Sequence, residues 1–140
     1  MVAPRETFAS LLRARRGYLA TISPEGAPHL LPVCFTWAGE VIWTAIDGKP
    51  KSTEELQRIK DISANPSICF TVDRWDEDWS RLAWLQARGT ASVLVRGPEI
   101  EKARAALKSK YAQYADTPLE GPVIRIDVER WVGWEPQTSD

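Results

Sequence analysis

The chain has 140 residues, of which 44% are hydrophobic and 26% are charged, and its formal net charge is -1. This length and composition are typical of one folded globular domain, so we expect a single domain over residues 1–140 and exclude disordered and collagen-like classes. A net charge this close to zero gives no broad attraction to nucleic acid or to anionic lipid, so we expect neither nucleic acid nor a membrane as a partner.

Two cysteines and the lack of long apolar runs indicate the compartment. Cys34 and Cys69 each lie inside an apolar run, without the paired spacing of a zinc site or the density of a disulfide scaffold, so we expect buried, reduced thiols. No run approaches the roughly 20 apolar residues that span a membrane, and the N-terminus lacks the apolar stretch of a signal peptide. We therefore expect a cytoplasmic protein.

The first part of the chain predicts one helix and three strands. Phe8, Leu11 and Leu12 mark one face of an amphipathic helix that ends near Gly17. Turn residues then separate three apolar segments, which we predict to be strands at residues 18–22, 29–37 and 41–46. Because short turns join these segments, we predict a three-strand antiparallel meander.

A turn with two lysines follows the meander. Gly48 and Pro50 end the strand, and Ser52 lies three residues before a glutamate, which is the capping-box spacing that begins a helix. Unpaired N–H groups at a helix start, together with the charges of Lys49 and Lys51, favour a bound phosphate. The alternative is an ordinary strand-to-helix connection with solvated lysines.

The second part of the chain predicts two more helices and three more strands. The first helix, from about Thr53, ends before Asn65-Pro66, because the residue before a proline resists helical geometry. The strands are predicted at residues 67–72, 82–95 and 123–134. The longer helix follows Gly97-Pro98 and presents apolar residues at helical spacing, namely Ile100, Ala103, Leu107, Tyr111 and Tyr114.

Two details of these strands bear on the fold. Gly89 interrupts the strand at 82–95 and indicates a bulge or a close backbone approach. In the last strand, Ile124, Ile126, Val128 and Val132 are predicted to share the core face. About six strands with about three helices and mostly hairpin links favour a small antiparallel β-barrel with helices packed outside it.

Few residues suggest catalytic or metal chemistry. His29 is the single histidine, which excludes multi-histidine metal sites, and we interpret it as a structural strand residue. The acidic loop at residues 73–78 lacks the pattern of an EF-hand, so we expect no metal. Trp75, Trp79 and Trp84 are expected in the core or an interface, and the alternative is that Trp79 and Trp84 flank a planar ligand. No residue indicates an acid, base or nucleophile, so an enzyme of this sequence needs a cofactor.

Four motifs together suggest a family. They are Gly17-Tyr18-Leu19-Ala20-Thr21, then Gly26-x-Pro28-His29-Leu30-x-Pro32-Val33-x-Phe35, then Trp43-Thr44 with Lys49-Pro50-Lys51, and Asn65-Pro66. With them the chain resembles, over nearly its whole length, the split β-barrel flavin and deazaflavin oxidoreductases, the superfamily of pyridoxamine 5'-phosphate oxidase. Asp47-x-Lys49-Pro50-Lys51 with Asp76-Glu77-Asp78-Trp79-Ser80-Arg81-Leu82 is most similar to an actinobacterial branch that uses coenzyme F-420, an 8-hydroxy-5-deazaflavin, instead of FMN.

The resemblance implies a fold, an assembly and a set of cofactor contacts. The fold is a mainly β, split antiparallel barrel of about six strands with about three peripheral helices. The assembly is a homodimer with two cofactor sites at its interface. By this resemblance, Lys49 and Lys51 bind the cofactor phosphate, and Ser52 adds a hydroxyl. Trp43 and Thr44 lie along the ring system, and Pro32 and Val33 lie at the ring edge. Trp84 reaches the cofactor from the partner subunit.

The function implied is hydride transfer between reduced coenzyme F-420 and an electron-poor small organic substrate, the protein supplying placement. Two alternatives stay open. One is an FMN-binding reductase or oxidase on the same fold, and the other is a non-catalytic carrier of a flavin, deazaflavin or haem-like ligand. The chain ends in Trp134-Glu135-Pro136-Gln137, without the substrate-binding segment of the true pyridoxamine phosphate oxidases. Vitamin B6 oxidation is therefore not expected.

Overall fold

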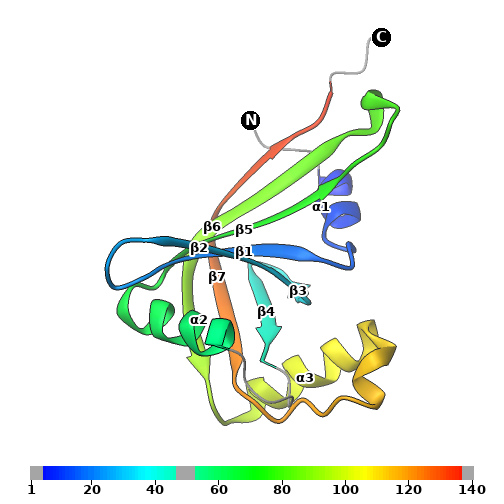
Figure 1. Ribbon diagram of the computed structural model, residues 1–140. Coiled ribbons are helices and arrows are strands. Elements are labelled where there is room, and N and C mark those ends of the chain that lie inside the picture. Colours follow the sequence, from blue (N-terminus) through cyan, green and yellow to red (C-terminus); the bar gives the residue numbers. More distant parts are fainter. Residues whose placement is uncertain (1–4, 47–52, 137–140) are drawn as a thin grey trace.

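The computed structural model describes residues 5–46 and 53–136, with no description of the side chains of residues 5 and 53–56 (Figure 1). Seven antiparallel strands form one sheet in the order β2-β1-β5-β6-β7-β4-β3. The strands are β1 (Gly17–Ile22), β2 (Pro28–Val33), β3 (Thr36–Ala38), β4 (Val41–Ala45), β5 (Ser67–Arg74), β6 (Ala83–Leu94) and β7 (Val123–Trp134). The helices are α1 (Arg5–Leu11), α2 (Thr53–Ala64) and α3 (Pro98–Lys110), with 3-10 turns η1 (Trp79–Arg81) and η2 (Ala112–Ala115).

The sheet curls so that its two edges meet. β2 and β3 lie at opposite ends of the strand order, yet only Cys34 and Phe35 separate the end of β2 from the start of β3. Two connecting residues span at most about 10 Å of extended chain, so the edges must be that close. The side chain of Phe35 is fully buried and fills the space inside the curl. This half-barrel confirms the predicted split antiparallel barrel.

The predicted three-strand meander is right in its two antiparallel hairpins and wrong in its continuous middle strand. β1 pairs with β2 and β3 pairs with β4, as two separate hairpins at opposite edges of the sheet. The segment predicted as one strand at residues 29–37 is broken at Cys34 and Phe35, where the chain crosses from one edge to the other. The break adds a seventh strand to the six that were expected.

The core fills the inside of the curl, and helices close its ends. Leu19, Phe35 and Phe70 are among its fully buried side chains. α1 covers one end, where Leu11 is buried and the ring centres of Phe8 and Trp131 are 6.0 Å apart. The predicted amphipathic covering helix is confirmed, although it ends at Leu11 rather than near Gly17.

A bulge in the β6–β7 pair explains why one sequence prediction holds and another fails. The register shifts between Arg88 and Gly89, as predicted, and a Cβ on Gly89 would lie 2.0 Å from the carbonyl oxygen of Asp127. The shift reverses which side chains of β7 face inward, so Trp131 packs against the core. The prediction that Val132 faces the core is therefore wrong.

α3 packs against the outside of β4 and β7. The carboxylate of Glu99, in its first turn, accepts hydrogen bonds from the Trp43 indole (2.9 Å) and the Arg125 guanidinium (2.7 Å). The Trp43 hydrogen bond is the main cause that lowers the pKa of Glu99. The predicted helix ends at Lys110, and Tyr114 lies in η2 instead.

The outward face of β1, β5 and β6 stays open. Every outward side chain of these strands is partly or fully exposed in the described structure. β5, β6 and β7 extend together beyond the other strands of the sheet (Figure 1). Trp84 is 37% exposed and Trp134, its cross-strand neighbour, is 39% exposed. Among the helices described, none combines the length and apolar character that a bilayer crossing requires.

Candidate functional site

The structure describes five of the eight residues that were predicted to contact the cofactor. Lys49, Lys51 and Ser52 lie outside the described residues. Val33 and Thr44 are brought together and are both buried, and the Thr44 hydroxyl donates to the Cys34 carbonyl at 2.6 Å. That hydrogen bond ties the end of β2 to β4.

The other three contacts lie on outward faces. Trp43 points away from Thr44 and packs beside α3. Pro32 is exposed at the end of β2, and Trp84 is exposed on β6. β2 and β6 are separated by β1 and β5, which amounts to roughly 14 Å at about 4.8 Å per strand. One chain therefore does not bring Pro32 and Trp84 together.

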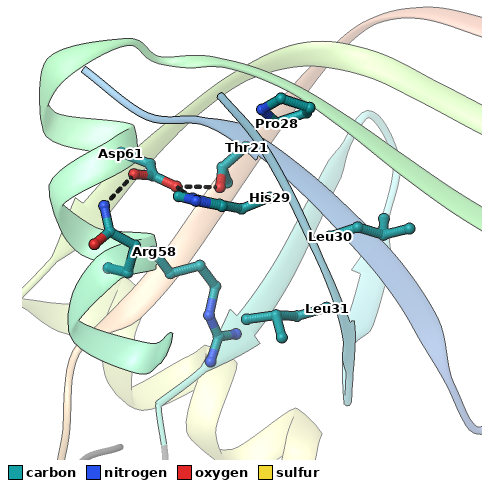
Figure 2. Close-up of a pocket in the computed structure, with 8 residues that line it drawn as sticks. Thr21, Pro28, His29, Leu30, Leu31, Arg58 and Asp61 are labelled. Carbon is teal, nitrogen blue, oxygen red and sulfur yellow. Dashed lines mark hydrogen bonds and ion pairs between the residues drawn. The ribbon is translucent and has the colours of Figure 1, made fainter. Parts of the chain in front are cut away.

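A pocket of about 350 Å³ lies between the β1–β2 hairpin and α2 (Figure 2). This volume is at the lower end of the range for small-molecule sites. The lining residues come from β1, β2 and α2, and they are Thr21, Pro28, His29, Leu30, Leu31, Gln57, Arg58 and Asp61. The pocket therefore borders the strand that leads to Pro32 and Val33.

A buried carboxylate organises the polar side of this pocket. The Asp61 side chain is fully buried on α2, and its Oδ2 accepts the Thr21 hydroxyl at 2.7 Å. The same oxygen lies 2.6 Å from His29 Nδ1, and Oδ1 accepts the Gln57 amide at 2.8 Å. Figure 2 shows the His29 ring reaching from β2 toward this carboxylate. Both oxygens of Asp61 therefore have partners, as a buried carboxylate requires.

These contacts fix the ionisation of Asp61. Burial acts to raise the pKa of its carboxyl, but hydrogen bonds from Gln57, His29 and Thr21 outweigh burial and hold the pKa below the usual value. Asp61 is therefore ionised at neutral pH and can only accept hydrogen bonds. It follows that the hydrogen between His29 and Asp61 belongs to Nδ1 of the imidazole.

The rest of the pocket lining is largely apolar. Pro28, Leu30 and Leu31 line the pocket, with the Leu31 side chain on the same side of β2 as His29 and the Leu30 side chain on the opposite side (Figure 2). Arg58 is only 9% exposed, and its side chain extends from α2 toward Leu31 (Figure 2). The pocket thus suits a compact ligand with an apolar body and a polar edge.

The sequence analysis did not identify this cluster and interpreted His29 as structural only. Two local signals were available, because Gln57 and Asp61 are four residues apart on a predicted helix and Thr21 faces His29 across a predicted hairpin. The missing information was the contact between that helix and that hairpin. The described residues contain no group of three or more histidine, cysteine or carboxylate side chains arranged to hold a metal ion.

The cysteine prediction needs a correction. Cys34 is exposed and Cys69 is partly exposed, so the prediction that both thiols are buried is wrong. The reason is local, because Val33 and Phe35 point into the core and the alternating backbone turns Cys34 outward.

Comparisons with known proteins agree with this architecture. A family model described as pyridoxamine 5'-phosphate oxidase matches residues 4–135. No curated protein sequence matches the chain. A conserved hypothetical protein of Mycobacterium tuberculosis has a solved structure with a TM-score of 0.76 and 19% identity, over 100% of this chain and 93% of that one.

Two further solved structures have informative descriptions. A protein described as an F-420 reductase has a TM-score of 0.61 and 24% identity, over 88% of this chain and 94% of that one. A FAD-binding protein of Mesorhizobium loti has a TM-score of 0.71 and 17% identity, over 95% of this chain and 93% of that one. At these identities the likeness is one of fold.

Proposed function

Because the chain belongs to the pyridoxamine 5'-phosphate oxidase family of split-barrel flavin- and deazaflavin-binding proteins, we propose that it is a coenzyme F-420-dependent oxidoreductase acting as a cytoplasmic homodimer. The observation that carries the proposal is the family match over residues 4–135. The solved F-420 reductase of similar fold and the lysine turn at residues 49–51 favour F-420 over FMN.

In this proposal the cofactor phosphate lies at the lysine turn. Lys49 and Lys51 neutralise its charge, and Ser52 adds a hydroxyl where α2 begins. The ring then lies along the ends of β2 and β4, near Pro32, Val33, Trp43 and Thr44. The hydrogen bond from Thr44 to the Cys34 carbonyl supports this arrangement, because it holds those two strand ends side by side.

The residues present fit a ring at a subunit interface better than a ring within one chain. Pro32 and Trp84 are both accessible, but three strand spacings separate β2 from β6. A ring that lies against Pro32 would therefore not reach Trp84 of the same chain. The proposal resolves this by taking Trp84 from the partner subunit.

A homodimer also suits the open face of the sheet. Trp75, Trp84 and Trp134 line a hollow of about 350 Å³ at the far end of the β5–β6 hairpin. Exposed tryptophans of this kind are typical of interfaces. The proposal places the second copy against this aromatic end and the outward faces of β1, β5 and β6.

The cofactor, when bound, supplies the hydride chemistry. The chain contributes binding of the phosphate, orientation of the ring, and exclusion of water from the reacting faces. The proposed substrate is a small, electron-poor organic molecule.

Fluorescence titration tests the proposal. The purified protein is titrated separately with F-420 and with FMN, alongside Lys49→Ala with Lys51→Ala and the matched pair Lys102→Ala with Lys108→Ala on α3. We expect micromolar or tighter F-420 binding by the wild type and the control pair. The test pair should lose about 1 to 3 kcal/mol for each charge-assisted contact.

Each other outcome has a distinct meaning. Tight FMN binding without F-420 binding supports the FMN-dependent alternative. Tight binding without turnover of quinones, nitroaromatics, enones or tetrapyrroles supports a carrier. No binding of either cofactor at micromolar concentration refutes the proposal.

A further inference from the structure

His29 has one edge held by protein and the other edge accessible. Its Nδ1 lies 2.6 Å from the buried Asp61, whereas 38% of the imidazole side chain is exposed. The ring is part of the lining of the pocket between the β1–β2 hairpin and α2 (Figure 2). An ordered imidazole edge therefore borders a space large enough for a small molecule.

Three hydrogen bonds to Asp61 fix the orientation of the imidazole and which of its nitrogens faces the pocket. Asp61 accepts from Thr21 on β1 and from Gln57 on α2 as well as from His29, so the carboxylate cannot rotate without losing a hydrogen bond. Because ionised Asp61 accepts the hydrogen of Nδ1, the lone pair of a neutral His29 imidazole lies on Nε2. In that form the second nitrogen of His29 is a hydrogen-bond acceptor with a fixed orientation.

We propose that this pocket binds a compact ring compound with an acidic O–H or imide N–H, which donates its hydrogen to Nε2 of His29. The Leu31 side chain, which is on the same side of β2 as His29, contacts the apolar face of the ring. The inference goes beyond the proposed cofactor contacts, since no lining residue of the pocket is among them.

The proton can also move along this hydrogen bond. The O–H or N–H bond of the ligand breaks and an Nε2–H bond forms, which leaves an anionic ligand and an imidazolium. Asp61 stabilises the imidazolium, and no electrons are exchanged. Asp61 acts here as a positioning residue for His29.

The single histidine makes a direct test possible. Protein with nitrogen-15 histidine shows one imidazole in the NMR spectrum, and the two nitrogen shifts identify the tautomer. In the protein without cofactor we expect hydrogen on Nδ1. Added 4-nitrophenol should shift Nε2, whereas 4-nitroanisole, which lacks the O–H, should not. The absorbance of bound 4-nitrophenol reports transfer of the proton.

Substitutions separate a ligand contact from a structural role. His29→Ala should weaken 4-nitrophenol binding about tenfold, which is the loss of one hydrogen bond, and His29→Gln should restore part of it by offering an amide oxygen. Asp61→Asn should move the imidazole hydrogen to Nε2 and abolish 4-nitrophenol binding. The control Asp116→Asn, at an exposed position, should leave the tautomer and the binding unchanged. Thermal unfolding confirms that each variant is folded.

Two results would overturn the inference. One is an imidazole that responds equally to 4-nitrophenol and 4-nitroanisole. The other is no response of wild-type Nε2 to millimolar 4-nitrophenol. That result would mean that the hydrogen bonds of Asp61 only hold α2 against the β1–β2 hairpin. Neither result depends on F-420 or FMN, so the two proposals can fail separately.

Discussion

At the scale of a single residue, ionisation of Asp61 makes the free energy of unfolding depend on pH. Hydrogen bonds keep the pKa of its carboxyl below the ordinary 3.8 in the folded protein. Since the folded state holds the proton less tightly than the unfolded chain, Asp61 stabilises the fold above pH 3.8 and loses that effect as the pH falls toward its lower folded value.

The substitution Asp61→Asn should expose this coupling. At neutral pH we expect a loss of about 1 to 3 kcal/mol in the free energy of unfolding, because a hydrogen-bonded buried charge is removed. The difference from wild type should shrink below about pH 4. Urea unfolding of both proteins between pH 7 and pH 3 measures it. A difference that does not change with pH would show that ionisation of Asp61 contributes nothing.

Lys110 also makes stability rise with pH, but in the alkaline range and because folding disfavours its charged form. Its ammonium lies 3.6 Å from the centre of the Phe35 ring and donates to the Phe35 carbonyl at 2.9 Å. Burial and the charge of Arg15 lower its pKa from 10.5 to about 8. Above pH 8 the folded state releases a proton that the unfolded chain keeps up to pH 10.5, so stability rises with pH in that window.

We therefore expect the wild type to gain stability relative to Lys110→Met between pH 8 and pH 9.5. Comparison of the two variants cancels the titration of other groups, including Tyr111, whose pKa burial raises. Paired denaturant titrations at pH 7, 8 and 9.5 test this. Parallel profiles would mean that Lys110 keeps an ordinary pKa in the folded protein.

At the scale of the element, the β6–β7 bulge determines which side chains of β7 face outward from the sheet. A Cβ at residue 89 would lie 2.0 Å from the Asp127 carbonyl oxygen, which is backbone and cannot swing aside. Gly89→Ala should therefore destabilise the protein by about 1 to 3 kcal/mol, as overpacking does. Chemical denaturation measures the cost, with Gly26→Ala as a control whose Cβ meets no atom within 4 Å but whose φ is +87°. A Gly89→Ala protein as stable as wild type would contradict the close approach.

The local elements and the two hairpins β1–β2 and β3–β4 could be predicted from the sequence, whereas the order of the strands in the closed sheet could not. α2 ends where Asn65-Pro66 predicts, and the shift in register lies at Gly89, because prolines and glycines act on their own backbone. The break at Cys34 carries no such residue and follows from closure of the whole sheet. Asp61 and His29 are 32 positions apart, and only the packing of α2 on the hairpin joins them.

At the scale of the whole molecule, the open sheet face predicts association. Trp84→Glu places a charge where we propose that the partner packs, and burying an unpaired charge is costly. We expect the dimer to dissociate at least about tenfold more readily, while Val95→Glu, an exposed apolar residue in the loop after β6, has no effect. Sedimentation velocity over a concentration series measures this. Equal dimer stability in both variants would place the interface elsewhere.

The central claim, a homodimer that holds two cofactors, is tested most directly by native mass spectrometry of the purified protein mixed with F-420 or with FMN. The method counts subunits and bound cofactors in one measurement. The account predicts a dimer that carries two F-420 molecules. A monomer, or a dimer that takes up neither F-420 nor FMN, would contradict it.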